Sequence, residues 1–542
     1  MGFAEIVAIL AGCGAFLLGF KVLSDNMEKI AGGSLKRLFN KTSDKRMVNV
    51  GMGVAATAVV QSSSITTVMV VGFVNAGIMS LKQAAAVIMG ANIGTTITGQ
   101  IAALQAFDID SVFMLMLFVG VFMDLFSKKE RVKFSGLALA GLGLVFVGLG
   151  LMSDPMKGLS ANPAVTDFLG AIKSPILLLL IGVALTAIIQ SSSAVTTIVI
   201  SMAGAGLIIG NGGNSALYVI LGSNIGTCVT AMISSIGTSV NARRASLIHL
   251  LFNVLGTCIF IVLLLCWPTF NDMVLAKLFT QPNTQIAMFH TIFNITSTLL
   301  FLPFTGTLVT LATKLVPDKE EKAKDESEFV YMDKRFLKTP TVALEQLKKE
   351  SFRLADIAMN SLQTGFDSFI NKNLDTLEGV YKANETVAKL SGNISEYLVL
   401  VSACDVTFAD EKMVNTLHTD IGDIARIAEI ADNFAKYTKR AVEENLTFSE
   451  GINEKLAQMQ AKLQEQYQLV KEIVLYGKMD KKPQSDALED EIDGMRRDLI
   501  AEHIARLAQG KCRPENNTVF INLVSNMERA GDHLNYIVYN GD

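Results

Sequence analysis

The sequence carries one polar motif twice, each time inside an apolar run. "TAVVQSSSITT" occupies residues 57–67, and "TAIIQSSSAVTT" occupies residues 186–197. Both stretches place a glutamine and three consecutive serines among hydrophobic residues. A duplicated polar tetrad in such surroundings needs a physical reason, because a buried polar group without a partner is costly.

Half of the 542 residues are hydrophobic, and the mean hydropathy is +0.40. Apolar runs of roughly 20 residues, long enough to cross a bilayer, occur at 3–23, 134–152, 246–267 and 285–315. No Lys or Arg precedes the first run, so we predict a span there rather than a cleaved signal. The six cysteines show no paired spacing, so we expect neither a disulfide framework nor a zinc site.

Charged residues gather after about residue 316. We therefore predict an all-α, polytopic membrane protein with a second helical domain. The predicted parts are a membrane domain over 1–315, a charged linker over 316–340 and a helical domain over 341–542.

The membrane domain contains an internal repeat. The two QSSS tetrads are 129 residues apart, from Gln61 to Gln190, and at the same separation residues 11–27 and 140–156 share seven identities in seventeen positions. "GANIGTT" at 90–96 and "GSNIGTC" at 222–228 form a third pair. We predict repeat one over about 3–126, repeat two over about 134–266 and a final span over 285–315.

Basic clusters set the expected orientation. They lie at 36–46, at 128–133, at 243–244 and from 314 onward, and basic loops favour the cytoplasm. The N-terminus is then outside, the C-terminal domain is cytoplasmic, and the repeated block crosses the membrane in opposite directions. Inverted repeats of this kind are typical of secondary transporters in a cell membrane.

The second QSSS tetrad follows a short apolar run. Residues 175–189 would form a helix of about 22 Å, which is shorter than the roughly 30 Å hydrocarbon core. We predict a helix break within the membrane, where N–H groups suit an anion and oxygen atoms suit a hard cation such as sodium. Serine and threonine can also simply hold helices together, and the duplication favours a binding site.

Two further patterns have competing interpretations. The glycine, asparagine and threonine of the "GANIGTT" pair can pack and bend helices or line a site, and the duplication favours a site. "HLLFN" at 249–253 and "HTIFN" at 290–294 place His and Asn on one helix face. For these histidines we favour a structural role.

These motifs resemble the type II sodium/phosphate cotransporter family, over roughly residues 1–315. The resemblance implies inorganic phosphate as substrate, Na⁺ as coupling ion and a site between the two QSSS breaks. The implied phosphate-binding residues are Gln61, Ser62, Ser63, Ser64, Gln190, Ser191, Ser192, Ser193, Asn92 and Asn224. The implied sodium-binding residues are Ser64, Thr67, Thr95, Ser193, Thr197 and Thr227.

Six helical stretches follow residue 340, which suggests two three-helix units. "MERAGDH", which ends at residue 533, resembles the motif of the phosphate-uptake regulator (PhoU) domain. That resemblance implies a metal ion at Glu528 and Asp532, with Glu429 and Asp432 as the related pair. A solvated salt-bridge face is the alternative.

We hypothesise sodium-coupled phosphate symport with a regulatory C-terminal domain. The alternatives are a transporter of another solute, a phosphate exporter, and a membrane-anchored phosphate sensor. The sequence lacks a phosphate-binding Gly-rich loop ending in Lys-Ser or Lys-Thr and any catalytic constellation, so we expect no enzyme and no nucleic-acid partner. Membrane lipid surrounds the protein, and a homo-oligomer or a regulatory protein partner stays open.

Overall fold

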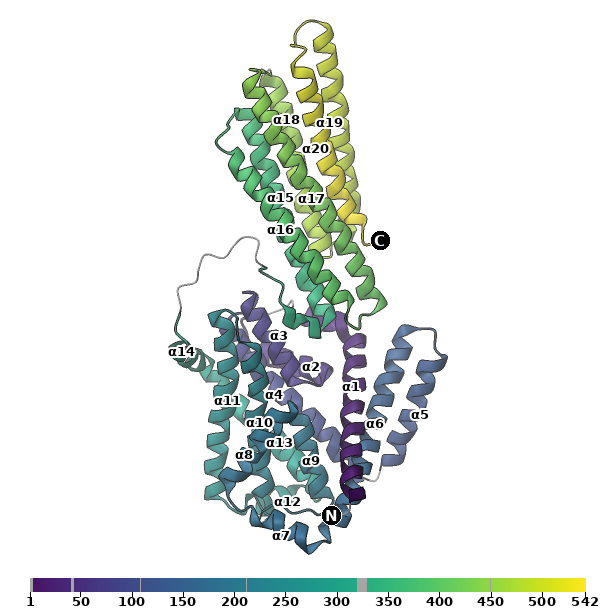
Figure 1. Ribbon diagram of the computed structural model, residues 1–542, viewed down its shortest axis with the longest axis vertical. Coiled ribbons are helices and arrows are strands. Elements are labelled where there is room, and N and C mark those ends of the chain that lie inside the picture. Colours follow the sequence, from purple (N-terminus) through teal and green to yellow (C-terminus); the bar gives the residue numbers. More distant parts are fainter. Residues whose placement is uncertain (1–2, 40–42, 108, 211, 319–328, 449) are drawn as a thin grey trace. The chain divides into compact units, whose positions relative to one another are not determined.

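The computed structural model describes residues 3–39, 43–107, 109–210, 212–318, 329–448 and 450–542. All regular secondary structure in these residues is helical, which confirms the all-α prediction. The chain forms two compact units, Met1–Glu320 and Glu321–Asp542, and Figure 1 shows the helices of each.

The first unit is a multi-pass membrane domain, because six helical stretches in its described residues are long and apolar enough to cross a bilayer. The range predicted for repeat one holds α1 (Phe3–Phe39), α2 (Arg46–Val60), α3 (Ser63–Asn75), α4 (Leu81–Ala103) and α5 (Asp110–Phe126). The range predicted for repeat two corresponds to α6 (Glu130–Ser160), α7 (Pro163–Ala171), α8 (Pro175–Ile189), α9 (Ser192–Gly204), α10 (Ser215–Ser234) and α11 (Val240–Cys266). They are followed by the short α12 (Ala276–Leu278), α13 (Pro282–Phe301) and α14 (Thr305–Leu315).

One predicted boundary was wrong. The first span does not end near residue 23, because α1 continues to Phe39. Within this helix the Asn26 amide nitrogen donates to the Val22 carbonyl at 2.7 Å. The predicted final span over 285–315 lies within Pro282–Leu315, a stretch long and apolar enough to cross a bilayer, in which the 3₁₀ turn Leu302–Phe304 joins α13 to α14.

Helices α1 and α6 pair in antiparallel fashion through glycines. A Cβ atom on Gly12 would lie 2.8 Å from the Gly148 carbonyl oxygen, and one on Gly19 would lie 2.8 Å from that of Gly141. The 129-residue repeat makes Gly141 the counterpart of Gly12, and Gly148 the counterpart of Gly19. The contact is therefore reciprocal, as expected for a two-fold related pair, and the repeated block runs in opposite directions.

Each QSSS stretch lies at the tip of a helical hairpin. The Gln83 amide donates to the Ser43 carbonyl at 3.4 Å, so α4 begins beside the start of α2. Only residues 76–80 join α3 to α4, so α3 must return to the side from which α2 came. In repeat two the Gly210 N–H donates to the Leu169 carbonyl at 3.0 Å, which brings the chain after α9 back to the start of α8.

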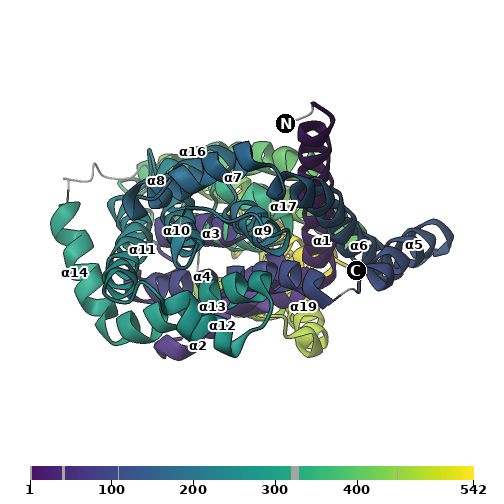
Figure 2. The ribbon, with the colours of Figure 1, turned by 90° about the horizontal axis from the view of Figure 1, so that it is seen from below.

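The two hairpins enter the unit from opposite ends of α13. Arg46, at the start of α2, donates to the Pro303 carbonyl at 2.9 Å, just beyond the end of α13. A Cβ on Gly204, at the end of α9, would lie 3.1 Å from the Asn283 amide nitrogen at the start of α13. Seen along the unit, α4, α9, α10 and α13 occupy its middle, while α5 and α14 lie at opposite edges (Figure 2).

The described residues of the second unit form six long helices. They are α15 (Pro340–Asn371), α16 (Leu377–Ser402), α17 (Phe408–Glu443), α18 (Glu450–Val470), α19 (Lys482–Ala508) and α20 (Asn516–Tyr539). The first three pack on one another, the last three do the same, and α17 packs on α20. This arrangement agrees with the predicted pair of three-helix units.

Candidate functional site

Both QSSS glutamines adopt the left-handed backbone conformation. Gln61 has φ +52° and ψ +22°, and Gln190 has φ +58° and ψ +25°. Non-glycine residues rarely adopt this region, and such residues often mark functional sites. The conformation ends α2 and α8, and the near-identical angles show that the two breaks are built in the same way.

The next residue, a serine, caps the helix that follows each break. The Ser62 hydroxyl accepts a hydrogen bond from the Ile65 N–H at 3.3 Å, and the Ser191 hydroxyl accepts one from the Ala194 N–H at 3.2 Å. Each cap uses one lone pair and leaves the hydroxyl proton as a donor. The first N–H groups of α3 and α9 also point toward the breaks, so each break presents several donors and a positive helix end.

The two glutamine side chains differ in their surroundings. The Gln61 amide donates to the Ala58 carbonyl at 2.5 Å, and its carbonyl oxygen accepts from the Thr98 hydroxyl of α4 at 3.1 Å. Gln61 is half-buried, whereas Gln190 is exposed. The symmetry of the backbone therefore does not extend to the side chains.

Helix α4 brings the two breaks together. Thr98 donates to Gln61 at the first break. A Cβ on the next residue, Gly99, would lie 3.7 Å from the Thr196 methyl group in the first turns of α9, just beyond the second break. Consecutive residues of one helix thus contact both hairpins, and α3 packs on α10 in the reciprocal way.

The "GxNIG" glycines are packing residues. A Cβ on Gly90 would lie 2.0 Å from the Val50 carbonyl oxygen, and one on its counterpart Gly222 would lie 2.0 Å from that of Leu179. Since no side chain fits there, these glycines let α4 approach α2 and α10 approach α8.

The asparagines between these glycines are buried polar groups. Asn92 and Asn224 are both 4% exposed. The Asn92 amide nitrogen has no hydrogen-bond partner among the described residues, and the Asn224 oxygen lies 3.2 Å from Nε2 of His290. Both predicted site residues therefore lie in the core of the unit.

The predicted sodium-binding residues fall into three groups. Thr67 and Thr197 are fully buried, and their hydroxyls find no partner among the described residues. Thr95 and Thr227 donate to carbonyls one turn earlier in their own helices, both at 3.1 Å. Ser64 and Ser193 are half-buried.

Two neighbouring residues were not among the predicted sodium-binding residues. Thr196 is 1% exposed, and its hydroxyl is also unpartnered within the described chain. The 129-residue separation pairs Thr67 with Thr196, so extending the repeat beyond the tetrad would have found it. Thr98 could not be found in this way, because its contact with Gln61 depends on the packing of α4.

The acidic residues predicted to bind metal are mostly in ion pairs. Glu429 pairs with Arg426 and Asp432 pairs with Lys436, both at 2.7 Å. Burial, followed by the charge of Asp532, raises the pKa of Glu528. Among the residues described, no three His, Cys, Asp or Glu side chains are grouped so that they could hold a metal ion. The PhoU resemblance and its metal site stay predictions.

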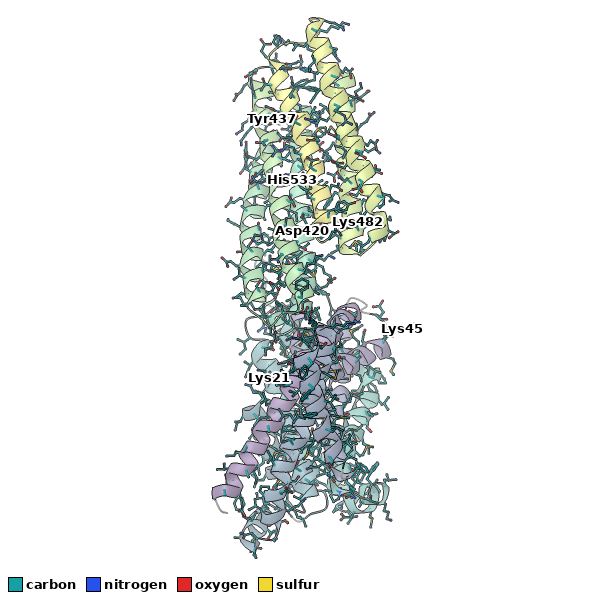
Figure 3. All side chains as sticks on the ribbon, turned by 90° about the vertical axis from the view of Figure 1, so that its right-hand side faces the viewer. Lys21, Lys45, Asp420, Tyr437, Lys482 and His533 are labelled. Carbon is teal, nitrogen blue, oxygen red and sulfur yellow. The ribbon has the colours of Figure 1, made fainter. Side chains whose placement is uncertain are left out.

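A different polar cluster links the two three-helix units of the second domain. The Asn540 amide donates to Asp420 and to Asp423, both at 2.9 Å, and Nδ1 of His533 lies 2.9 Å from Asp423. Figure 3 labels Asp420 and His533. Burial, opposed by the Asn540 hydrogen bond and reinforced by the Asp423 charge, raises the pKa of Asp420 to about 7. This carboxyl therefore titrates near neutral pH.

Comparison with known proteins identifies the family. The family model described as Na+/Pi-cotransporter matches residues 15–154 and 159–271. YqeW of Bacillus subtilis (strain 168), an uncharacterized protein, is 31% identical over 307 residues, which cover 56% of this chain and 96% of YqeW. The chain belongs to the Na+/Pi-cotransporter family.

Other relatives carry functional names. YjbB of Escherichia coli (strain K12), named as a proposed inorganic phosphate export protein, is 26% identical over 391 residues, 72% of this chain and 68% of YjbB. The human sodium-dependent phosphate transport protein 2B is 32% identical over 106 residues, 19% of this chain and 15% of that protein. No solved structure matches the chain.

Proposed function

We propose that this member of the Na+/Pi-cotransporter family moves inorganic phosphate together with sodium ions, at one site shared by the two helix breaks. Family membership and the names of relatives support phosphate as the substrate. The observation that carries the proposal is the contact of both hairpins with Thr98 and Gly99, consecutive residues of α4. This contact joins two separate anion-attracting helix ends into one region.

The chemistry of the breaks suits a tetrahedral anion. Ser62 and Ser191 keep a hydroxyl proton available, and the N-termini of α3 and α9 add backbone donors and positive dipole ends. Residues 47–80 and 174–242 contain no Lys or Arg. The charge of bound phosphate is therefore balanced by sodium rather than by a basic side chain.

The buried hydroxyls supply oxygen ligands of the kind that a hard cation prefers. Thr67, Thr196 and Thr197 each carry a hydroxyl without a protein partner in the described residues. Such groups are costly unless they coordinate an ion or a water molecule. Sodium bound there would complete the phosphate site, and rocking of one hairpin pair against the other would expose it alternately.

Export of phosphate is the second candidate. It is favoured by YjbB, whose match of 391 residues extends beyond the membrane unit. A coupled symporter runs in the direction set by the combined gradients, so one mechanism accommodates either direction. Phosphate flux measured under inward and then outward sodium gradients separates the two.

We place the basic end of the membrane unit in the cytoplasm, with the N-terminus outside and the C-terminal unit inside. Arg46 binds the Pro303 carbonyl, and Arg244 binds the Val316 carbonyl at 2.9 Å and Asp318 at 2.8 Å. These arginines lie beside the chain that leads out of α13 and α14, and basic ends favour the cytoplasmic face. Labelling of Cys512 by a membrane-impermeant reagent only after permeabilisation supports this orientation, and labelling of intact cells contradicts it.

The C-terminal unit is proposed to regulate transport. The last helix that could span a membrane in the described chain ends at Leu315. The Asp420–Asp423–His533 cluster joins its two three-helix units and is the element to perturb. A regulatory role predicts that substitutions there change the maximal transport rate and leave the KM for phosphate unchanged.

Radiolabelled phosphate uptake into proteoliposomes with an inward sodium gradient tests the function. Ser191→Ala removes a cap and a site donor, whereas Ser174→Ala removes only a cap, since Ser174 accepts from the Leu177 N–H at the start of α8. A cap contributes about 1 kcal/mol, so both variants lose similar stability. Ser191→Ala should also raise the KM for phosphate by about 10-fold or more, the value of one hydrogen bond to a charged group. Equal KM values in the two variants would show that Ser191 at the second break does not bind phosphate.

A further inference from the structure

His290 on α13 has one nitrogen engaged and one unused. It is 1% exposed, and its Nε2 lies 3.2 Å from the Asn224 oxygen. Its Nδ1 has no hydrogen-bond partner among the described residues. The histidine therefore departs from the structural interpretation, in which both nitrogens are satisfied.

The contact with Asn224 fixes the tautomer. The Asn224 amide nitrogen donates to the Ile220 carbonyl at 3.3 Å, so its oxygen faces His290. An oxygen can only accept, which places the proton of neutral His290 on Nε2. Nδ1 then carries a lone pair and is a buried acceptor without a donor.

This acceptor lies where the two hairpins meet. The Cβ position of Gly99 is 3.8 Å from His290 Nδ1, 3.7 Å from the Thr196 methyl group and 3.7 Å from the Ile200 side chain. Gly99 follows Thr98, which binds Gln61 at the first break. Nδ1 thus faces the junction of α4, α9 and α13, beside residues of both breaks.

The anion donors of this region are hydroxyl and N–H groups, which bind unprotonated oxygens of any tetrahedral anion. A lone acceptor among them suits a substrate that has both bare oxygens and a hydroxyl. At neutral pH phosphate retains at least one P–OH group, whereas sulfate has none. A buried acceptor also repels an unprotonated anionic oxygen. It therefore favours an anion that carries a hydroxyl group and disfavours one that does not.

We propose that His290 Nδ1 accepts a hydrogen bond from the P–OH group of the substrate and thereby selects hydrogen phosphate over sulfate. The inference rests on the proposed phosphate transport. It assigns His290 as a specificity-determining residue contributed by α13, which lies outside both predicted repeats.

One substitution separates the functions of the two His290 nitrogens, and a second substitution serves as its control. His290→Gln keeps an amide near the Nε2 position, where it can still donate to Asn224, and removes the Nδ1 acceptor. His249→Gln is the matched control, because His249 is equally buried, lies in the similar "HLLFN" pattern on α11, and also has ring nitrogens without a hydrogen-bond partner among the described residues. Phosphate uptake is measured in proteoliposomes with arsenate, which retains a hydroxyl, and sulfate as competitors.

In wild-type protein, arsenate should compete with phosphate and sulfate should not. His290→Gln should raise the KM for phosphate about 10-fold or more, as for a lost hydrogen bond to a charged group. It should also narrow the gap between arsenate and sulfate inhibition, that is, the difference between their inhibition constants for phosphate uptake. His249→Gln should leave that gap unchanged. Equal loss of phosphate, arsenate and sulfate affinity in His290→Gln overturns the assignment.

Gly99→Ala provides a second test that does not alter the histidine. Its methyl group fits at ordinary contact distances of 3.7–3.8 Å and fills the space in front of Nδ1. The variant should fold and should lose the same selectivity, and retained selectivity contradicts the inference. If wild-type protein moves no phosphate, the proposed function itself fails, whereas phosphate transport with unchanged selectivity in both variants refutes only the role of His290.

Discussion

The close crossing of α2 and α4 gives a sharp test of how the first hairpin is held. A Cβ on Gly53 would lie 2.0 Å from the Val87 carbonyl oxygen, whereas real Cβ atoms essentially never come closer than 3.0 Å to such an atom. Gly53→Ala must therefore part the two backbones by about 1 Å. Overpacking of this kind costs about 1–3 kcal/mol, and a rigid backbone partner places the cost at the upper end.

Gly51→Ala, two residues earlier in α2, is the matched control. A Cβ there would meet nothing within 4 Å, and the counterpart of Gly51 in repeat two is Leu180, which is 53% exposed. Alanine in place of glycine gains up to about 1 kcal/mol of helix propensity, so this variant should be neutral or slightly stabilised. Gly53→Ala gains the same propensity and loses more through the clash.

Thermal unfolding of the full chain in detergent measures the difference. Gly53→Ala should lower the unfolding midpoint by several degrees relative to Gly51→Ala, and it should slow phosphate uptake, because α2 ends at the first break. Gly182→Ala, with a Cβ position 2.2 Å from the Val219 carbonyl oxygen, should behave as its symmetry-related counterpart. Equal midpoints for Gly53→Ala and Gly51→Ala would refute the packing explanation.

Thr98→Val removes the 3.1 Å hydrogen bond to Gln61 at similar volume. The loss of about 1 kcal/mol should raise the KM for phosphate several-fold. An unchanged KM would show that the contact of α4 with Gln61 does not support phosphate binding. Asp420 has its pKa raised from 3.8 to about 7, so the folded state retains a proton that the unfolded chain releases. The contribution of Asp420 to the free energy of unfolding is therefore fully present below about pH 4. It is lost progressively between about pH 4 and pH 7, and the total loss is at most about 4 kcal/mol. Asp420→Asn should therefore raise the unfolding midpoint at pH 8 but not at pH 4, and equal effects at both values would contradict the burial argument.

Much of the membrane fold could be predicted because local signals were duplicated. The apolar run at 175–189 coincides with α8, and the tetrad at its end lies at the break, as a helix too short for a bilayer requires. The identities between 11–27 and 140–156 predicted the inverted arrangement, which the reciprocal glycine contacts of α1 and α6 confirm. These features depend on sequence neighbours or on a fixed separation along the chain.

Features that depend on packing between helices could not be predicted. The duplication of the "GxNIG" pattern favoured a site role, whereas the 2.0 Å approach to Val50 assigns its glycine Gly90 to packing. The contact of Thr98 with Gln61 and the free nitrogen of His290 arise where distant helices meet. The predicted end of the first span near residue 23 was wrong for a local reason, because the Asn26 amide nitrogen donates to the Val22 carbonyl within the helix and α1 continues past it.

Equilibrium binding of radiolabelled phosphate to the purified full-length protein tests the central claim most directly. A single site shared by both breaks predicts one phosphate bound per chain, binding that requires sodium, and weaker binding in both Ser62→Ala and Ser191→Ala. Two phosphates per chain, or binding that one of these substitutions leaves unchanged, would show that the breaks act separately and would contradict the shared site.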